Sequence, residues 1–164
     1  MDASTLVALV AVVASGLVGG LFFGWSVSVI PGTARTDDRT YVSTMQHINR
    51  AIVNPGFIIP FLGLPVVMAL AAYLHWRVGE RRRAGLLLGA TVVYLVGVLG
   101  VTFGANVPRN NALEAFDLAG AEPADLGNRR RTYEQGWNRW HQIRAAASVA
   151  TLVVAAAAIA IDDE

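Results

Sequence analysis

STLVALVAVVASGLVGGLFFGWSVSVI, residues 4–30, contains no charged side chain, and this stretch decides what kind of protein the chain forms. Three further apolar stretches follow at residues 52–76, 84–105 and 143–161. About 20 apolar residues in a helix are needed to span the hydrocarbon core of a bilayer. The four stretches therefore predict an all-α fold in one domain, residues 1–164: an up-down four-helix bundle integral to a membrane.

Composition narrows the range of functions. The chain has no cysteine, which excludes a disulfide framework, a dithiol relay and an iron–sulfur cluster held by this chain. A net charge of +1 gives no reason to expect nucleic acid as a partner. The first stretch is long and no basic residue precedes it, so we expect a span and not a cleaved signal peptide. The expected location is the cell membrane, with several crossings and with lipids as neighbours.

The segment between the first two apolar stretches, residues 37–53, has the pattern of an amphipathic helix. Asp37 or Asp38 can cap its start. Apolar residues then recur at helical spacing, at Tyr41, Met45, Ile48 and Ile52. We expect this helix to precede the second span and to lie at the membrane surface or lead into the bilayer.

Glycines recur every four residues in the first stretch, at Gly16, Gly20 and Gly24. Glycines at this spacing form a flat stripe along a helix, which allows another helix to approach closely. The neighbour is either another span of the same bundle or a second copy of the chain. The stripe therefore indicates close packing and leaves a homo-oligomer as an alternative.

Most polar residues near the apolar stretches fall at one set of their ends. A chain that crosses four times places the end of the first span, the start of the second, the end of the third and the start of the fourth on the same side. Those ends carry Ser26, Ser28, Asn49, Asn54, Asn106, Asn110, Asn111, Trp137, Trp140, His141 and Arg144. The opposite ends carry little besides an arginine cluster at residues 77–83. We expect the function at the polar end.

The asparagines of this end have two interpretations. An amide at membrane depth is costly unless it is paired, and it offers both donors and acceptors. The group could line a polar pocket that binds an oxygenated ligand and stabilises developing negative charge. Each asparagine could also cap a helix or form a hydrogen bond between helices. The convergence of five asparagines on one end favours the pocket.

The charged and titratable residues of the same end lead to further alternatives. Arg144 either extends to lipid phosphates or points inward to an anionic ligand. No acidic residue lies within the four apolar stretches, which leaves Arg144 without a partner there and argues against a proton-coupled pump. His47 and His141 could act as a base, bind copper or zinc, or form interfacial hydrogen bonds. Two histidines without a carboxylate or cysteine pattern make a poor metal site, so no metal is expected.

Four sequence motifs, taken in order, resemble one known family. They are FFGWSVSVIPG at 22–32, MQHINRAIVNP at 45–55, NVPRNN at 106–111 and WNRWHQIR at 137–144. The chain resembles the DUF1772 or anthrone oxygenase-like integral membrane proteins from about residue 11 to residue 158. The family often has asparagine where this chain has His141.

The resemblance implies a small four-helix membrane protein. Some fungal members look like oxygenases that convert anthrones to anthraquinones without an organic cofactor. For this chain it implies a cofactor-independent O₂ oxidation of a lipophilic, anthrone-type aromatic, with His47 or His141 as the base. Arg144 is the third implied catalytic residue, as a donor to the enolate oxygen. The implied substrate-binding residues are the amides and walls of the polar pocket: Asn49, Asn54, Asn106, Asn110, Asn111, Phe22, Phe23, Trp137 and Trp140.

A function of another class uses the same residues. The polar pocket could belong to a membrane protein without catalytic activity that binds a quinone, a lipid headgroup or a partner subunit. Both functions require the motifs at 45–55, 106–111 and 137–144 to converge on one cavity. They differ in whether the bound molecule reacts.

Overall fold

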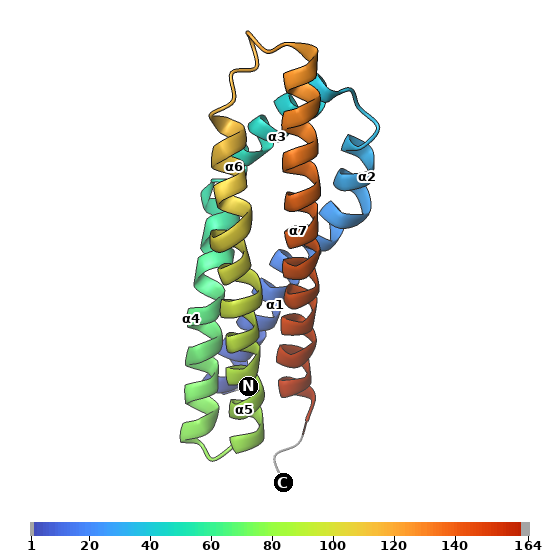
Figure 1. The fold of residues 1–164 in the computed structure, drawn as a ribbon. Coiled ribbons are helices and arrows are strands. Elements are labelled where there is room, and N and C mark those ends of the chain that lie inside the picture. The colour runs from blue at the N-terminus through green and yellow to red at the C-terminus, as the bar shows by residue number, and fades with distance from the viewer. Residues whose placement is uncertain (1, 162–164) are drawn as a thin grey trace.

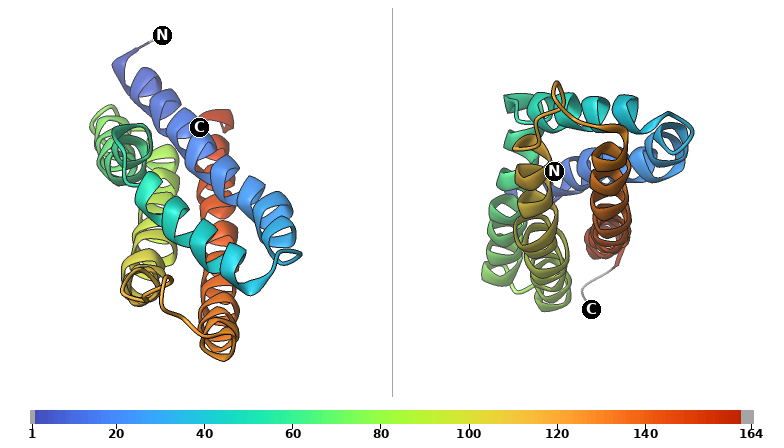
Figure 2. Two further views of the ribbon diagram at one scale, coloured as in Figure 1. Left: turned by 90° about the horizontal axis from the view of Figure 1, so that it is seen from above. Right: turned by 45° about the horizontal axis from the view of Figure 1, so that its top comes forward.

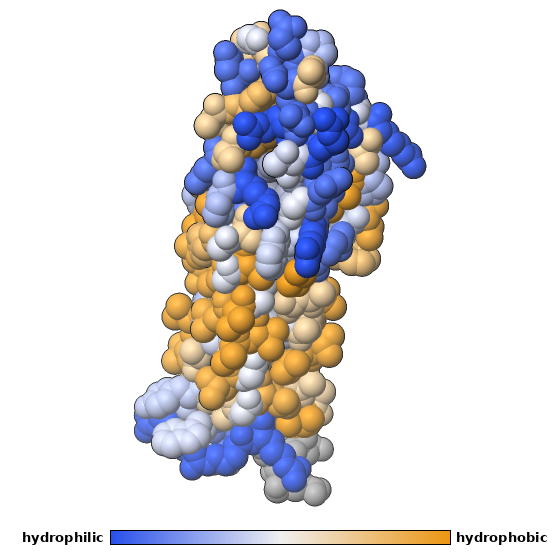
Figure 3. All heavy atoms as spheres, viewed as in Figure 1, coloured by the Kyte–Doolittle hydropathy of each residue, from blue (hydrophilic) through white to orange (hydrophobic). Residues whose placement is uncertain are grey.

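The computed structural model describes residues 2–161, and in this part of the chain helices follow one another without a strand (Figure 1). Four continuous helical segments are long and apolar enough to cross a membrane: Ala3–Thr33, Pro55–Arg77, Arg81–Glu114 and Pro123–Ala160. On the face seen in Figure 3, an apolar belt lies between two polar ends. The predicted all-α fold is confirmed, and the chain is an integral membrane protein.

The first span consists of α1 (Ala3–Gly24), a π-helical turn η1 (Trp25–Val29) and α2 (Ile30–Thr33). Asp2 caps α1, because its carboxylate accepts a hydrogen bond from the Thr5 amide at 2.8 Å. Hydrogen bonds from Thr5 and Ser4 lower the pKa of Asp2 to about 2. The predicted apolar stretch ended at Ile30, whereas the helix continues to Thr33.

The predicted amphipathic helix is α3 (Asp38–Ala51). Asp37 caps it by accepting hydrogen bonds from the Thr40 amide at 3.0 Å and the Thr40 hydroxyl at 2.6 Å, which hold the pKa of Asp37 below its usual range. The helix buries Tyr41, Val42 and Met45. Seen from above, α3 crosses over the polar end of the bundle (Figure 2, left).

The second span, α4 (Pro55–Arg77), remains one helix although two prolines lie inside it. Pro65 has no N–H to donate to the Phe61 carbonyl one turn earlier. The hydroxyl of Tyr94 donates to that carbonyl instead, at 2.8 Å. This bond joins α4 to the third span near the middle of the bundle.

The third span consists of α5 (Arg81–Val93), two π-helical segments η2 (Tyr94–Gly100) and η3 (Thr102–Asn106), and α6 (Val107–Glu114). The predicted apolar stretch ended at Ala105, whereas the helix continues to Glu114, because Pro108 lies in the first turn of α6, where proline is tolerated. At Gly97 a side-chain carbon would approach the Ala147 methyl group to 2.6 Å, so glycine allows η2 to pack closely on the last helix.

The last helix, α7 (Pro123–Ala160), runs the length of the molecule (Figure 1). The predicted apolar stretch 143–161 is only its second half. The first half is polar and ties α7 to the preceding elements through Arg130. That guanidinium donates to the carboxylates of Asp38 and Glu134 and to the carbonyl of Thr36.

The two halves of the bundle pack differently. The lower half is the one that contains the turn between α4 and α5, at the bottom of Figure 1. In this half α1 and α5 each pack on both α4 and α7. The helices meet around small buried residues, namely Ala8, Ala11, Ala71, Ala90 and Ala155. In the upper half η3 and α6 pack on α7, and α6 also packs on α3. Seen from above, α4 and the third span diverge toward this end (Figure 2, left).

The glycine stripe does not serve packing within the described part of the chain. Apart from the adjacent residues and the backbone of the same helix, no described atom lies within 4 Å of a side-chain carbon placed at Gly16, Gly20 or Gly24. Gly19, beside the stripe, is the glycine of α1 that faces α7. A side-chain carbon placed at Gly19 would lie 3.6 Å from the Ser148 carbonyl oxygen. A second copy as the partner of the stripe stays a prediction.

Candidate functional site

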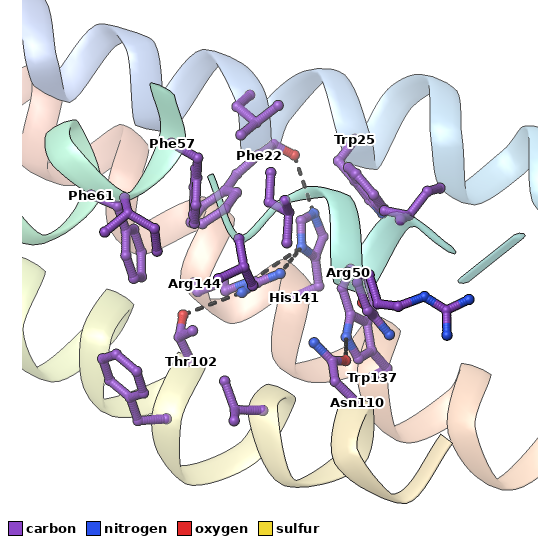
Figure 4. A pocket seen from close by; sticks show the side chains of 18 of the residues that line it. Phe22, Trp25, Arg50, Phe57, Phe61, Thr102, Asn110, Trp137, His141 and Arg144 are labelled. Atoms are coloured by element: carbon purple, nitrogen blue, oxygen red, sulfur yellow. Dashed lines mark hydrogen bonds between the residues drawn. The ribbon is translucent and has the colours of Figure 1, made fainter. Parts of the chain in front are cut away.

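A cavity of about 720 Å³ lies in the upper half of the bundle. Residues of α1 and η1, α3, α4, η3, α6 and α7 line it. Most of the wall is apolar, and a few polar groups point into it (Figure 4). This volume and this mixture of surfaces are typical of a small-molecule site.

Residues predicted from distant parts of the sequence meet in this cavity. Those that line it are Phe22, Asn49, Asn110, Asn111, Trp137, His141 and Arg144. They come from α1, α3, α6 and α7, so the fold brings together residues of all four motifs, at 22–32, 45–55, 106–111 and 137–144.

The other predicted residues lie elsewhere. His47 is exposed on α3, with its Nδ1 at 2.7 Å from the Ser43 carbonyl. Asn54 caps α4 by accepting from the Phe57 amide. Asn106 is fully buried and donates to the Trp137 carbonyl at 3.2 Å.

Two predicted wall residues are also outside the cavity. Phe23 points away from the bundle and lines a shallow groove between α1 and α7. Trp140 is partly buried on α7, and the cavity wall on this helix is made by Trp137 instead.

Two of the predicted asparagines have the structural roles that the sequence left open. Asn54 caps a helix, and Asn106 forms a hydrogen bond between helices.

Arg144 is the central feature of the cavity. Its side chain is buried, with 8% of the residue exposed, and its guanidinium lies between His141 and Thr102 (Figure 4). Nε and one Nη donate to Nδ1 of His141 at 3.3 and 3.1 Å, and the other Nη donates to the Thr102 hydroxyl at 3.2 Å. The guanidinium carbon also lies 4.5 Å from the centre of the Phe22 ring.

Arg144 therefore has unused donors. A guanidinium carries five N–H groups, and the contacts with His141 and Thr102 use three. Among the described residues, no carboxylate forms an ion pair with Arg144. A buried cation without a counter-charge is costly, so this group favours an anion in the cavity.

The contacts of His141 define its tautomer. Its Nδ1 accepts from the guanidinium of Arg144, which has no acceptor, so Nδ1 carries no proton. The proton of the neutral ring is then on Nε2, which lies 3.2 Å from both the Phe22 carbonyl and the Ser26 hydroxyl. His141 is fully buried and stacks on Trp137 with ring centres 4.9 Å apart. In this arrangement its basic lone pair is occupied.

A chain of hydrogen bonds orients Asn110. The amide of Asn49 donates to the Tyr133 hydroxyl, and that hydroxyl donates to Oδ1 of Asn110 at 3.0 Å. Trp137 Nε1 donates to the same oxygen at 2.8 Å. Because Oδ1 accepts both bonds, the NH₂ group of Asn110 remains as a donor to the cavity. Asn110 and Arg144 thus present donors from two different helices.

Aromatic rings form much of the wall. Phe57 and Phe61 stack with ring centres 4.7 Å apart, and Phe22 lies against both at 6.4 and 6.3 Å. Trp25 and Trp137 lie 5.9 Å apart on the other side. Parallel and inclined rings of this kind suit a flat aromatic ligand.

Sequence reasoning missed several of these residues, namely Trp25, Arg50, Phe57, Phe61, Thr102 and Glu114. Phe57 and Phe61 are four residues apart and so share a helix face, but in a uniformly apolar span this spacing does not stand out. Arg50 and Glu114 form an ion pair between α3 and α6 at the polar edge of the cavity. Nothing in the sequence pairs two charges that are 64 positions apart.

A metal centre gains no support from the arrangement. Within residues 2–161 there is no group of three histidine, cysteine or acidic side chains placed to hold an ion. His47 lies outside the cavity that contains His141.

Fold and site together define a class: an integral membrane protein whose four-span bundle encloses a polar and aromatic cavity. Residues 57–154 match the family model described as Anthrone oxygenase, of the DUF1772 family. The match covers more than half of the chain, and the protein belongs to this family. No curated protein and no solved structure is significantly similar to the chain. The match includes α4, α6 and the polar part of α7 that line the cavity.

Proposed function

We propose that this protein binds a lipophilic, anthrone-type aromatic molecule in its cavity as an oxygen anion and that the bound anion is oxidised by O₂. The observation that carries the proposal is Arg144, a buried cation with two unused N–H donors and no acidic partner among the described residues. Family membership favours the same chemistry. We place the reaction in the cell membrane.

The cavity can stabilise such an anion electrostatically. The NH₂ group of Asn110 is held in place before the ligand arrives by the bonds that its Oδ1 accepts from Tyr133 and Trp137. Arg144 is anchored by Thr102, while its bonds to His141 are the ones that it exchanges for bonds to the ligand. Donors that are fixed in advance in a site of low polarity stabilise developing negative charge more than mobile donors in water do. The aromatic walls orient the flat ring system and exclude water.

The proposed reaction converts a CH₂ group opposite the aromatic carbonyl to C=O. Loss of one C–H proton gives an enolate, whose oxygen binds Arg144. The enolate transfers one electron to O₂, and the resulting carbon radical and superoxide combine to a peroxide. The peroxide loses water together with the second hydrogen of the carbon. In total CH₂ and O₂ give C=O and H₂O, and O₂ accepts the four electrons that the carbon loses.

His141 is the proposed base, and its hydrogen bonds make the role conditional on the ligand. While Arg144 donates to Nδ1, that nitrogen cannot accept a proton. A ligand oxygen that draws the guanidinium toward itself frees Nδ1 for the substrate C–H group. Nε2 remains held by the Phe22 carbonyl and the Ser26 hydroxyl. The base thus becomes active only when a ligand is bound.

The test is oxygen uptake by the purified protein in detergent with emodin anthrone as substrate, corrected for spontaneous oxidation. We expect uptake by the unmodified protein and a loss of about a hundredfold in Arg144→Gln, because a charged donor to an oxyanion contributes about 3 kcal/mol. Arg139→Gln is the matched control, since Arg139 is exposed on the same helix. Uptake that is unchanged in Arg144→Gln would contradict the proposed role.

A second candidate is a binding protein without catalysis, for a quinone, a lipid headgroup or a partner subunit. The observation in its favour is the occupied lone pair of His141, because the cavity as it stands contains no other imidazole. Binding without oxygen uptake, tested with the same anthrone and with the corresponding anthraquinone, would select this candidate.

A further inference from the structure

We infer that the ligand reaches the cavity sideways from the bilayer, through a gap between the first half of α4 and the segment η3–α6. The protein then acts on molecules that are dissolved in the membrane in neutral form and that ionise only at Arg144. This inference rests on the proposed ligand class and adds the route by which that ligand arrives. We call the opening the lateral gap.

The lateral gap begins where α4 leaves the third span. The Tyr94 hydroxyl bonds to the Phe61 carbonyl, and the rings of Phe61 and Phe103 lie 6.4 Å apart, so the two spans still touch at this level. Above it, α4 keeps α1 as its packing partner, whereas η3 packs on α7 and α6 packs on α7 and α3. The divergence of the two spans is visible from above (Figure 2, left).

Two side chains support an opening of this gap toward the bilayer. Leu62 on α4 and Phe103 on η3 both line the cavity, yet 43% of Leu62 and 54% of Phe103 are exposed. Both lie in spans that are apolar enough to cross a membrane. A side chain that faces the cavity and the lipid at once marks an opening. An apolar molecule that passes it exchanges one apolar surface for another.

The polar edge of the cavity is a poor alternative for such a ligand. The ion pair of Arg50 and Glu114 connects α3 and α6 there. A lipophilic ring system that entered from water would have to leave the membrane and displace two charged groups. The two openings therefore differ in the chemistry that they admit, and the lateral gap admits flat, uncharged, membrane-soluble molecules. Aromatic molecules that carry a sugar or a sulfonate should be excluded.

The experiment closes each opening in turn. The chain has no cysteine, so a pair introduced at chosen positions reacts alone. Leu62→Cys with Phe103→Cys is bridged by a bifunctional methanethiosulfonate reagent, which a reductant removes. The matched control is Arg50→Cys with Glu114→Cys, bridged across the polar edge. The probe is 1,8-dihydroxyanthraquinone in phosphatidylcholine vesicles. The signal is tryptophan quenching in a protein with Trp76→Phe and Trp140→Phe, so that the emission comes from Trp25 and Trp137, which line the cavity.

We expect the bridge across the lateral gap to slow binding of the probe by about tenfold or more and the reductant to restore the rate, because access limits association. The bridge across the polar edge should leave the rate unchanged. The opposite pattern, or equal slowing by both bridges, would overturn the lateral route.

An independent pair of variants guards against a bridge that disturbs the fold. Leu62→Ala widens the lateral gap and should speed association, while Leu70→Ala, on an exposed part of the same helix, should not. Equal rates in the two variants would contradict the inference. A probe that never binds to the unmodified protein would reject the ligand class, and with it the proposed function, whereas binding at an unchanged rate in the bridged protein rejects the route alone.

Discussion

The two ends of this bundle each bury a histidine, and the surroundings of these histidines differ. At the lower end His75 contacts the carboxylate of Glu80, which also accepts from Arg83 at 3.5 Å. At the upper end His141 faces the guanidinium of Arg144, and no carboxylate of the described residues is paired with it. The buried histidine of the lower end thus has a carboxylate partner. The upper end has an excess positive charge beside a cavity, so it is suited to bind an anion.

Packing follows the same division. Small side chains let the helices meet closely in the lower half, where α4 and α5 lie together. In the upper half the first and third spans contain the π-helical segments η1 and η3, and residues of both line the cavity. A π-helical turn is less stable than an α-helical one and is frequent at functional sites. We therefore expect the lower half to contribute most to stability, and we propose that the ligand binds in the upper half.

The largest effect is expected when the upper end is given its own counter-charge. In Thr102→Asp a carboxylate replaces the hydroxyl that accepts from Arg144, so it competes with the ligand for the guanidinium. Oxygen uptake with emodin anthrone should fall by about a hundredfold, as for loss of the donor itself. Thr102→Asn is the control, because it accepts a hydrogen bond without charge. Full activity in Thr102→Asp would contradict the role of Arg144 as an anion site.

Removing the counter-charge at the lower end should affect stability instead. Glu80→Gln leaves the buried His75 without its carboxylate, and thermal unfolding in detergent should show a loss of about 1–3 kcal/mol. Binding of 1,8-dihydroxyanthraquinone should not change at a temperature where the variant is folded. Glu122→Gln, at an exposed position before α7, is the control. A loss of binding in Glu80→Gln would show that the two ends are not independent.

A smaller effect is expected from the hydrogen bonds that orient Asn110. Tyr133→Phe removes the hydroxyl that links Asn49 to Asn110. A hydrogen bond of this kind contributes about 0.5–1.5 kcal/mol, so the rate of oxygen uptake should fall by up to about tenfold. Tyr41→Phe is a matched control, because Tyr41 is also buried and its hydroxyl forms no hydrogen bond with the described residues. Oxygen uptake measured side by side compares the two. Equal activity of both variants would remove Asn110 orientation from the mechanism.

The smallest effect concerns the cap of α3, the helix that covers the cavity. The pKa of Asp37 is lowered in the folded protein by its bonds to Thr40, so this contribution to stability is present above the ordinary pKa of 3.8 and is lost as the pH falls through the lowered value. The protection of amides at the start of α3 from hydrogen exchange, taken relative to the intrinsic exchange rate at each pH, should decrease in acid, and in Asp37→Ala it should be low at neutral pH as well. Protection that does not change with pH in the unmodified protein would contradict the cap.

Sequence analysis predicted the fold well because the decisive signal is local. Uncharged stretches identify spans, and the spacing of Tyr41, Met45 and Ile48 identifies α3. The ends of the spans were less accurate. The third span continues past Asn106, because Pro108 lies where a helix tolerates proline, and α7 starts at Pro123, because its first half is polar.

The site was only partly predictable. Polar residues at depth, such as Arg144 and Asn110, stand out against an apolar background, and the order of crossings places them on one side. The order of crossings does not predict the direction in which a side chain points. Asn106 and Asn110 lie one helical turn apart, but only Asn110 lines the cavity. Phe57, Phe61 and Thr102 carry no signal within an apolar span. Their part in the cavity depends on how the helices diverge, which is a tertiary property.

The central claim is that Arg144 binds an anionic oxygen, and ionisation of a bound phenol tests it most directly. The visible absorption of 1,8-dihydroxyanthraquinone reports its ionisation, so its pKa can be measured in vesicles with and without the protein. An adjacent guanidinium should lower the pKa of the bound probe by about 1–3 relative to probe in protein-free vesicles, and Arg144→Gln should abolish this decrease. A bound probe whose pKa is unchanged or raised, or a decrease that persists in Arg144→Gln, would contradict the account.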